Sequence, residues 1–170
     1  MSKNITLRPA LDADITFILR VNEENVEVLS PMDESKLRKF MQTAAQVNVA
    51  EVDGSPAGFI IVLREGLDYY KSENYLWFSR KYPAFLYIDR VVIDAPFRGM
   101  GVGRWFYEDV FALAAKQKIA HVTAEIDTIP YNEASLRYHE VMGFREVGEQ
   151  FIRGGTVKVS LQEAPVKIEP

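Results

Sequence analysis

Residues 85–118 read FLYIDRVVIDAPFRGMGVGRWFYEDVFALAAKQK and predict a strand, a glycine-rich turn and a helix in succession. The segment opens with an apolar run, residues 85–93, interrupted only by Asp89 and Arg90. Such a run is typical of a strand that is covered on both faces. Beyond the glycines, apolar residues recur at helical spacing and predict a helix of about 16 residues. These apolar positions are Val102, Phe106, Val110 and Leu113.

Three glycines lie between the predicted strand and the predicted helix, inside the segment Arg98-Gly99-Met100-Gly101-Val102-Gly103-Arg104. Glycines let a backbone approach a ligand closely, and the free amides and dipole of a helix N-terminus attract phosphate oxygens. The first turn of the helix carries a basic residue and no acid, since the acids come only at Glu108 and Asp109. We therefore expect an external anion such as a pyrophosphate here. The alternative is a glycine-rich turn that binds nothing.

Two well-known phosphate motifs do not fit this segment. The pattern G-x-x-x-x-G-K-[ST] is absent, and the dinucleotide pattern fails because Arg104 stands three residues after Gly101 where a glycine is required. Nucleotide hydrolases and Rossmann enzymes are therefore disfavoured.

The rest of the chain alternates between helical and strand patterns. A short strand at residues 5–8 precedes two amphipathic helices, one carrying Ile15 and Ile18 and one carrying Leu37 and Phe40. A hairpin is expected over residues 48–52 and 58–63, a strand over 121–126, a helix over 132–142 and a second hairpin over 144–152 and 156–161. The order of elements predicts a mixed α/β layer architecture.

Two motifs in the predicted order resemble the GNAT superfamily of acetyl-CoA-dependent N-acetyltransferases. Residues 93–103 are similar to its coenzyme loop, R/Q-x-x-G-x-G/A, at Arg98, Gly101 and Gly103. Downstream, Asn132-Glu133-Ala134-Ser135 leads to Gly143-Phe144, as in the family segment N-x-x-A/S followed by a helix that ends in G-F. The resemblance covers residues 5–161. It implies a mixed central sheet of about seven strands flanked by about four helices, in one domain over residues 1–163 with a polar tail over 164–170.

The resemblance also implies a binding site for acetyl-CoA as co-substrate, with no metal. Backbone groups of the central strand would pair with the pantetheine arm, amides of the glycine loop would hold the pyrophosphate, and two polar residues would contact the arm. The cofactor-binding residues are then Val91, Val92, Ile93, Arg98, Gly99, Met100, Gly101, Val102, Gly103, Arg104, Asn132 and Ser135.

Helical geometry supports the second motif independently. At 100° per residue, Asn132, Ser135 and His139 fall within about 60° of one another, so their polar groups can face one ligand. The alternative is an N-cap Asn132, a solvated Ser135 and a surface His139.

The resemblance implies direct transfer, in which a neutral amine attacks the thioester and the coenzyme leaves as a thiolate. The protein must then supply a base, an oxyanion donor such as the amide of Val92 or Ile93, and an acid for the thiolate. Many family members place a tyrosine acid seven residues after the Asn. Here that position is His139, and Tyr138 stands one residue earlier. We prefer His139 as the catalytic residue and keep Tyr138 beside it.

Asp89 is the candidate base, because it shares one strand face with Tyr87, Val91 and Ile93. The competing interpretation is a structural carboxylate, either hydrogen-bonded or in a buried salt bridge. Because successive side chains of a strand point to opposite faces, Arg90 is excluded as the partner in such a salt bridge. His121, on a predicted strand, is expected to be structural.

Residues 66–83 hold six aromatic side chains among charged residues. Their spacing follows neither the period of two typical of a strand nor the period of 3.6 typical of a helix. The segment could form a lid or an acceptor pocket, since aromatic rings attract ammonium groups, or it could be satellite core packing.

The amino-acid composition limits the classes of partner that the protein is expected to bind. With 20 Lys and Arg against 24 Asp and Glu, the chain carries a net charge of -4, which disfavours a nucleic-acid partner. There is no cysteine, so thiolate metal sites and cysteine nucleophiles are excluded. No apolar run approaches the roughly 20 residues of a membrane span, and we expect a cytoplasmic protein without a membrane partner.

The expected partner is a small-molecule or peptide amine acceptor, which the sequence does not identify further. The sequence also leaves open whether the chain forms a homodimer. The alternatives are a catalytically inactive acyl-CoA sensor on the same fold and a plain structural or interaction domain.

Overall fold

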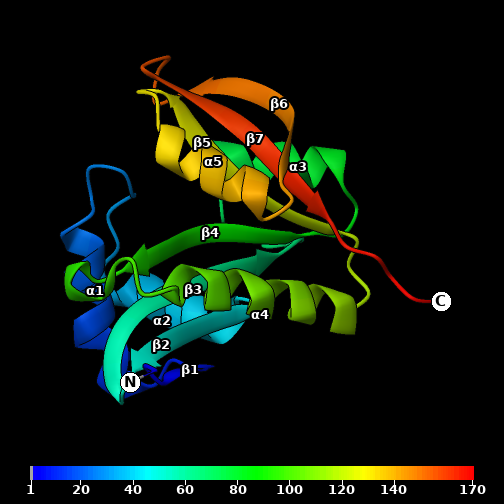
Figure 1. Ribbon diagram of the computed structural model, residues 1–170. Coiled ribbons are helices and arrows are strands. Elements are labelled where there is room, and N and C mark those ends of the chain that lie inside the picture. Colours follow the sequence, from blue (N-terminus) through cyan, green and yellow to red (C-terminus); the bar gives the residue numbers. More distant parts are fainter. Residues whose placement is uncertain (1) are drawn as a thin grey trace. The chain divides into compact units, whose positions relative to one another are not determined.

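The computed structural model describes residues 2–170, which form a mixed α/β fold with a seven-stranded sheet. The strand order is β1-β2-β3-β4-β5-β7-β6 (Figure 1). The chain divides into two compact units, one made of residues 2–63 with Ile88–Val110 and the other of Arg64–Tyr87 with Phe111–Pro170. The strand β4 (Leu86–Ile93) and the helix α4 (Val102–Lys116) each contribute residues to both units.

The first unit begins with the antiparallel strands β1 (Ile5–Pro9), β2 (Gln46–Val52) and β3 (Ser55–Arg64). The two residues of the β2–β3 turn, Asp53 and Gly54, both have positive φ angles, 51° and 82°, as a tight two-residue hairpin requires. The sequence prediction of a hairpin closed by Asp-Gly is confirmed.

Two amphipathic helices complete this unit, α1 (Ile15–Glu23) after a short 3-10 turn at Asp12–Asp14, and α2 (Glu34–Thr43). They bury a row of side chains that includes Ile18, Val21, Leu37 and Phe40, each fully buried. Asp33 caps α2 by accepting a 2.8 Å hydrogen bond from the Lys36 amide. Both helices agree with the periodicity of the sequence.

The second unit is built on β5 (His121–Ile129), β7 (Val157–Pro165) and β6 (Arg145–Ile152), paired antiparallel in that order. Two residues at the start of β4, Leu86 and Tyr87, pair in parallel with Val122 and Thr123 of β5. Between β5 and β6 lies α5 (Glu133–Val141). Each of these elements corresponds to one expected from the sequence.

The expected sheet of about seven strands flanked by about four helices is confirmed, and a fifth helix, α3 (Glu73–Lys81), gives residues 66–83 a structural role. It begins at Ser72, whose hydroxyl accepts from the Tyr75 amide. Tyr75 and Phe78 are buried and pack against neighbouring aromatic rings at centroid distances of 5.3–6.5 Å. The satellite-core interpretation of the aromatic segment therefore holds for these two side chains.

The Trp77 ring packs against β6 so closely that a Cβ on Gly148 would lie 2.3 Å from it, which explains the glycine at that position. The contacts of His121 fit the structural role expected for it: its ring stacks on Tyr82 at 4.0 Å, and its Nδ1 lies 2.5 Å from the buried Glu163 carboxylate.

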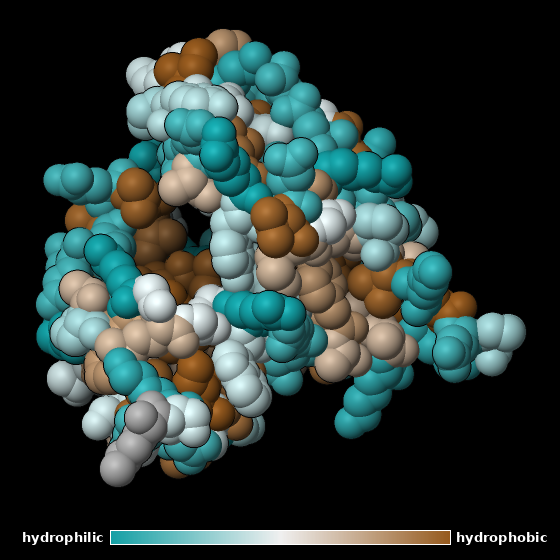
Figure 2. All heavy atoms as spheres, in the orientation of Figure 1, coloured by the Kyte–Doolittle hydropathy of each residue, from teal (hydrophilic) through white to brown (hydrophobic). Residues whose placement is uncertain are grey.

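The C-terminal strand runs further than the sequence indicated. The predicted polar tail at residues 164–170 starts two residues too early, because Ala164 and Pro165 pair with Val122 and His121 in β7. The Val166 amide still donates to the Ala120 carbonyl at 2.8 Å, and residues 167–170 then extend away from the end of the strand (Figures 1 and 2). No helix among residues 2–170 is long and apolar enough to cross a membrane.

Candidate active site

The glycine loop joins β4 to α4 in the first unit through a 3-10 turn at Ala95–Phe97. Gly99 and Gly101 have φ angles of 77° and 84°, in the left-handed region that favours glycine. No described heavy atom lies within 4 Å of a Cβ built on either one, so the glycines serve the backbone conformation rather than close packing. The sequence prediction of a glycine turn between a buried strand and a helix is confirmed.

The N-terminus of α4 presents donors without an acidic partner in its first turn. The first intrahelical bond runs from the Trp105 amide to the Gly101 carbonyl at 3.4 Å. The amides of Val102, Gly103 and Arg104 precede that bond, as expected for the first turn of a helix. The first turn contains no acid, and the Arg104 side chain is exposed, 2.7 Å from Glu108. This end of the helix suits a phosphate group.

Hydrogen bonds from side chains hold the start of the glycine loop, where it leaves β4. The buried Asp94 carboxylate accepts a 2.8 Å bond from Arg20, and Arg98 donates from Nε to the Ile93 carbonyl at 3.3 Å. The Arg98 amide itself donates to the Ala95 carbonyl at 3.3 Å. Of the predicted pyrophosphate-binding amides, that of Arg98 is therefore already used by the loop.

The strand β4 places Asp89 differently from the sequence expectation. Its carboxylate lies 2.8 Å from Arg90 Nε, and both side chains are only 2% exposed. The exclusion of Arg90 as a partner was therefore wrong. Arg90 also donates to Asn22 Oδ1 at 2.8 Å, to the Ser30 carbonyl at 3.0 Å and to Ser30 Oγ at 2.9 Å. The pair ties β4 to α1 and to the loop that precedes α2.

The second predicted motif lies at the start of α5 in the second unit. Asn132 caps the helix, with its Oδ1 accepting from the Ser135 amide at 3.1 Å, and Ser135 Oγ lies 3.4 Å from His139 Nδ1. The three residues therefore share one side of the helix, as their spacing predicted. The N-cap interpretation of Asn132 is also correct.

His139 is buried rather than solvated. Its Nδ1 lies 2.7 Å from the Ser135 carbonyl, and its ring meets Phe144 edge-on at 5.1 Å. Because a carbonyl can only accept, Nδ1 carries the proton and Nε2 has the lone pair of the neutral ring. Burial lowers the pKa of His139 below 6.5, opposed by the bond to Ser135. The lowered pKa favours the neutral ring at neutral pH, and the neighbouring Tyr138 on the same helix is 36% exposed.

Two carboxylates on β5 were missed by the sequence reasoning. Glu125 accepts a 2.9 Å bond from the Tyr87 hydroxyl, and burial raises the pKa of Asp127, opposed by the positive charge of Arg153. The Asp127 carbonyl also accepts from the Asn132 amide at 3.2 Å, so this acid adjoins the start of α5. The alternation of polar and apolar residues over 121–127 was the available signal.

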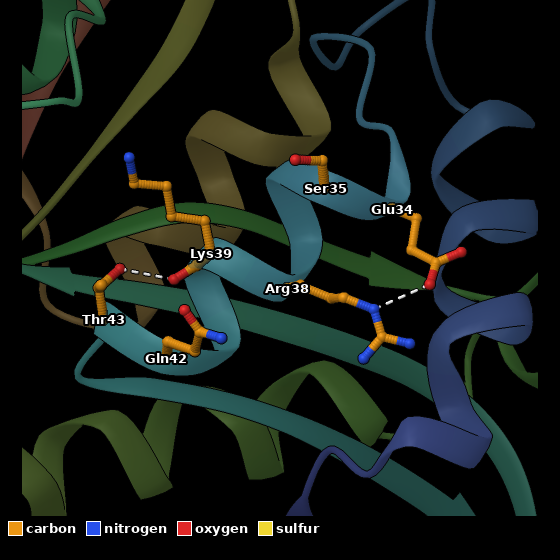
Figure 3. Close-up of a pocket in the computed structure, with 6 residues that line it drawn as sticks. All are labelled: Glu34, Ser35, Arg38, Lys39, Gln42 and Thr43. Carbon is orange, nitrogen blue, oxygen red and sulfur yellow. Dashed lines mark hydrogen bonds and ion pairs between the residues drawn. The ribbon is translucent and has the colours of Figure 1, made fainter.

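A separate hollow lies over the outward face of α2 (Figure 3). It is lined by Glu34, Ser35, Arg38, Lys39, Gln42 and Thr43. An ion pair between Glu34 and Arg38 at 2.8 Å holds two of these side chains on the helix surface. None of the lining residues belongs to the sets predicted for coenzyme binding or catalysis.

The sequence matches the Acetyltransferase (GNAT) family over residues 15–144. The chain belongs to this family. The matched range contains the glycine loop, α4 and the whole of α5. A comparison with curated proteins finds no match.

Solved structures show the same fold as this GNAT acetyltransferase at low sequence identity. Ard1 from Thermoplasma volcanium is 19% identical with a TM-score of 0.74, covering 96% of this chain and 98% of its own. Arabidopsis thaliana NAA60 in complex with a bisubstrate analogue is 14% identical with a TM-score of 0.74, covering 98% and 100%. Arabidopsis thaliana Naa50, in complex with the bisubstrate analogue CoA-Ac-MVNAL, is 17% identical with a TM-score of 0.70, covering 96% and 98%.

Proposed function

We propose that this GNAT acetyltransferase transfers an acetyl group from acetyl-CoA to a primary amine by direct attack in a ternary complex. The observation that carries the proposal is the N-terminus of α4, where the amides of Val102 and Gly103 precede the first intrahelical bond and no first-turn acid competes with a ligand. A pyrophosphate is the anion that these donors would bind. The complex of Naa50 with an analogue that contains CoA is consistent with this assignment.

In the proposed reaction, the amine nitrogen bonds to the thioester carbon, the carbon–sulfur bond breaks, and the thiolate takes up a proton. The backbone of Val91, Val92 and Ile93 would hold the pantetheine arm, assisted by Asn132 and Ser135. An amide of Val92 or Ile93 would donate to the developing oxyanion. No protein nucleophile is required.

The proton transfers need a base and an acid, for which Asp89, His139 and Tyr138 are candidates and Asp127 is a fourth. Asp127 is a candidate for the base because burial raises the pKa of its carboxyl group and its carbonyl oxygen accepts from the Asn132 amide at the start of α5. Asp89 is bonded to the buried Arg90 guanidinium, so its substitution is expected to affect folding as well as catalysis. Tyr138 suits the acid better than His139, whose lowered pKa keeps it neutral.

The test of the base is a pair of matched variants, Asp127→Asn and Asp89→Asn. If Asp127 is the base, its loss should lower kcat by about 10²-fold or more and remove the acid limb of the pH profile of kcat/KM. Asp89→Asn should lower the unfolding midpoint and leave that limb in place. The opposite pattern would return the role to Asp89.

The alternative function is an acyl-CoA sensor without turnover. It is favoured by one observation, the buried His139, whose pKa is lowered by burial, at the position where the family resemblance expects a tyrosine acid. Calorimetric titration with acetyl-CoA, followed by thiol release in the presence of small amines and peptides with free N-termini, separates the two. Thiol release with one acceptor class supports the transferase. Tight coenzyme binding with no thiol release across the panel supports the sensor.

A further inference from the structure

Lys36 is a primary amine held beside the strand β4 inside the first unit. It lies on α2 and is half-buried, with its Nζ 3.5 Å from both Ser30 Oγ and the Pro31 carbonyl and 5.8 Å from the centre of the Phe40 ring. Arg90 of β4 shares two of these neighbours, at 2.9 Å from Ser30 Oγ and 6.0 Å from the Phe40 ring centre. Lys36 therefore adjoins the buried end of the Arg90 side chain.

The surroundings of Lys36 raise the neutral, nucleophilic fraction of its amine above that of a free lysine. Burial lowers the pKa of Lys36, and the positive charge of Arg90 lowers it further. The negative charges of Asp89 and Asp33 oppose the shift. Its two hydrogen bonds are at the long limit for such contacts, so the amine is not tightly bound.

We propose that Lys36 is a self-acetylation site, at which its amine attacks the thioester of an acetyl-CoA molecule bound to the same chain. The inference rests on the proposed function, which assigns the pantetheine arm to the residues that directly follow Arg90 in β4. The Lys36 nitrogen–carbon bond forms and the carbon–sulfur bond breaks. Coenzyme A leaves with one proton, and the second proton lost by the ammonium group passes to solvent.

Acetylation would replace one of the two cations around Ser30 Oγ with a neutral amide. Arg90 would then keep Asp89 as its charged partner without the neighbouring positive charge of Lys36. The modification therefore relieves a like-charge contact next to β4. It also adds an acetyl group at the loop between α1 and α2.

The experiment follows the incorporation of isotope-labelled acetyl groups from acetyl-CoA into the purified protein by intact mass and peptide mapping. Lys36→Arg removes the acceptor and keeps its charge. Lys39→Arg is the matched control, because Lys39 lies on the same helix with its side chain on the outward face (Figure 3). Gly101→Glu blocks the coenzyme loop, and excess free coenzyme A competes for the site without any mutation.

The expected result is one label on Lys36, lost in Lys36→Arg, retained in Lys39→Arg, and suppressed by at least 10-fold by Gly101→Glu or by excess coenzyme A. The rate per molecule should not change with protein concentration. A Lys36 acetyl group already present on purified wild type, and absent from purified Gly101→Glu, counts as the same result.

Two patterns would overturn the inference and leave the proposed function standing. One is thiol release with amine acceptors while Lys36 stays unlabelled. The other is labelling of Lys36 at the same rate when the coenzyme site is blocked, which would be uncatalysed chemistry. A protein that neither binds acetyl-CoA nor releases thiol would overturn both the inference and the proposed function.

Discussion

Placing a carboxylate in the glycine loop should abolish coenzyme binding without unfolding the protein. Gly101 has a φ of 84°, and no described atom lies within 4 Å of its added Cβ, so Gly101→Glu meets backbone strain but no packing clash. The strain costs about 1–2 kcal/mol for a non-glycine residue. The new carboxylate would regain about 0.3–1 kcal/mol from the dipole at the N-terminus of α4.

The effect on binding should be much larger than the effect on folding. Each hydrogen bond from an amide to a charged phosphate oxygen contributes about 1.5–3 kcal/mol. Loss of two such bonds, with added charge repulsion, predicts at least a 100-fold increase in the Kd for acetyl-CoA. Gly101→Ala has the same backbone strain without the charge and should retain most of the affinity.

The matched control is Gly54→Glu, at the β2–β3 turn, where φ is 82° and no described atom lies within 4 Å of the added Cβ. It introduces the same charge and the same strain in the same unit. Calorimetric titration measures binding, and urea unfolding confirms that each variant is folded. If Gly101→Glu binds acetyl-CoA as tightly as Gly54→Glu does, the assignment of the pyrophosphate to this loop is wrong.

Three further predictions concern stability. Asp14 accepts two bonds from Arg8, at 2.7 and 2.9 Å, which hold its pKa below 3.8; Asp14→Asn should cost about 2 kcal/mol at pH 7 in urea unfolding. Because the pKa of Asp14 is depressed in the folded protein, the difference in unfolding free energy between wild type and Asp14→Asn should shrink as the pH falls below 3.8. A difference that stays constant down to pH 2 would contradict the ion pair. Gly58→Ala would bring a Cβ to 2.5 Å from the Val92 carbonyl and should cost about 1–3 kcal/mol, so an unchanged urea midpoint would refute that contact. Burial depresses the pKa of His139 below 6.5, so the wild type should lose stability relative to His139→Gln as the pH falls from 7.5 to 5. If the plots of unfolding free energy against pH run parallel for the two proteins, the pKa is not depressed.

The sequence located the elements whose signals are local. The hairpin follows from Asp53-Gly54, and α4 follows from apolar spacing after the glycines. By contrast, α3 was missed because its aromatic side chains do not lie on a single helical stripe. Trp77 packs against β6 at Gly148, while Tyr75 packs against other aromatic rings. Such contacts with distant parts of the chain are not encoded in the local spacing.

The candidate site was predictable where backbone geometry determines it, and less predictable where it depends on the hydrogen bonds and ion pairs that side chains form in the folded protein. Alternation places Asp89 and Arg90 on opposite faces of a strand, but a guanidinium on a long flexible stem reaches back to its neighbour at 2.8 Å. The protonated nitrogen of His139 likewise depends on the Ser135 carbonyl, which only the folded helix brings to 2.7 Å. Asp127 was overlooked because its burial is set by its surroundings in the folded unit.

The two tryptophans of the chain fall in different units, Trp105 in the first and Trp77 in the second. Each unit therefore contains its own intrinsic fluorophore. Trp105→Phe leaves an emission signal from the second unit alone, and Trp77→Phe leaves one from the first. Comparing the unfolding curves of these single-tryptophan proteins would reveal whether the units melt as one cooperative body. The signal of Trp105, at the first turn of α4, could in addition report ligand occupancy of the glycine loop in real time.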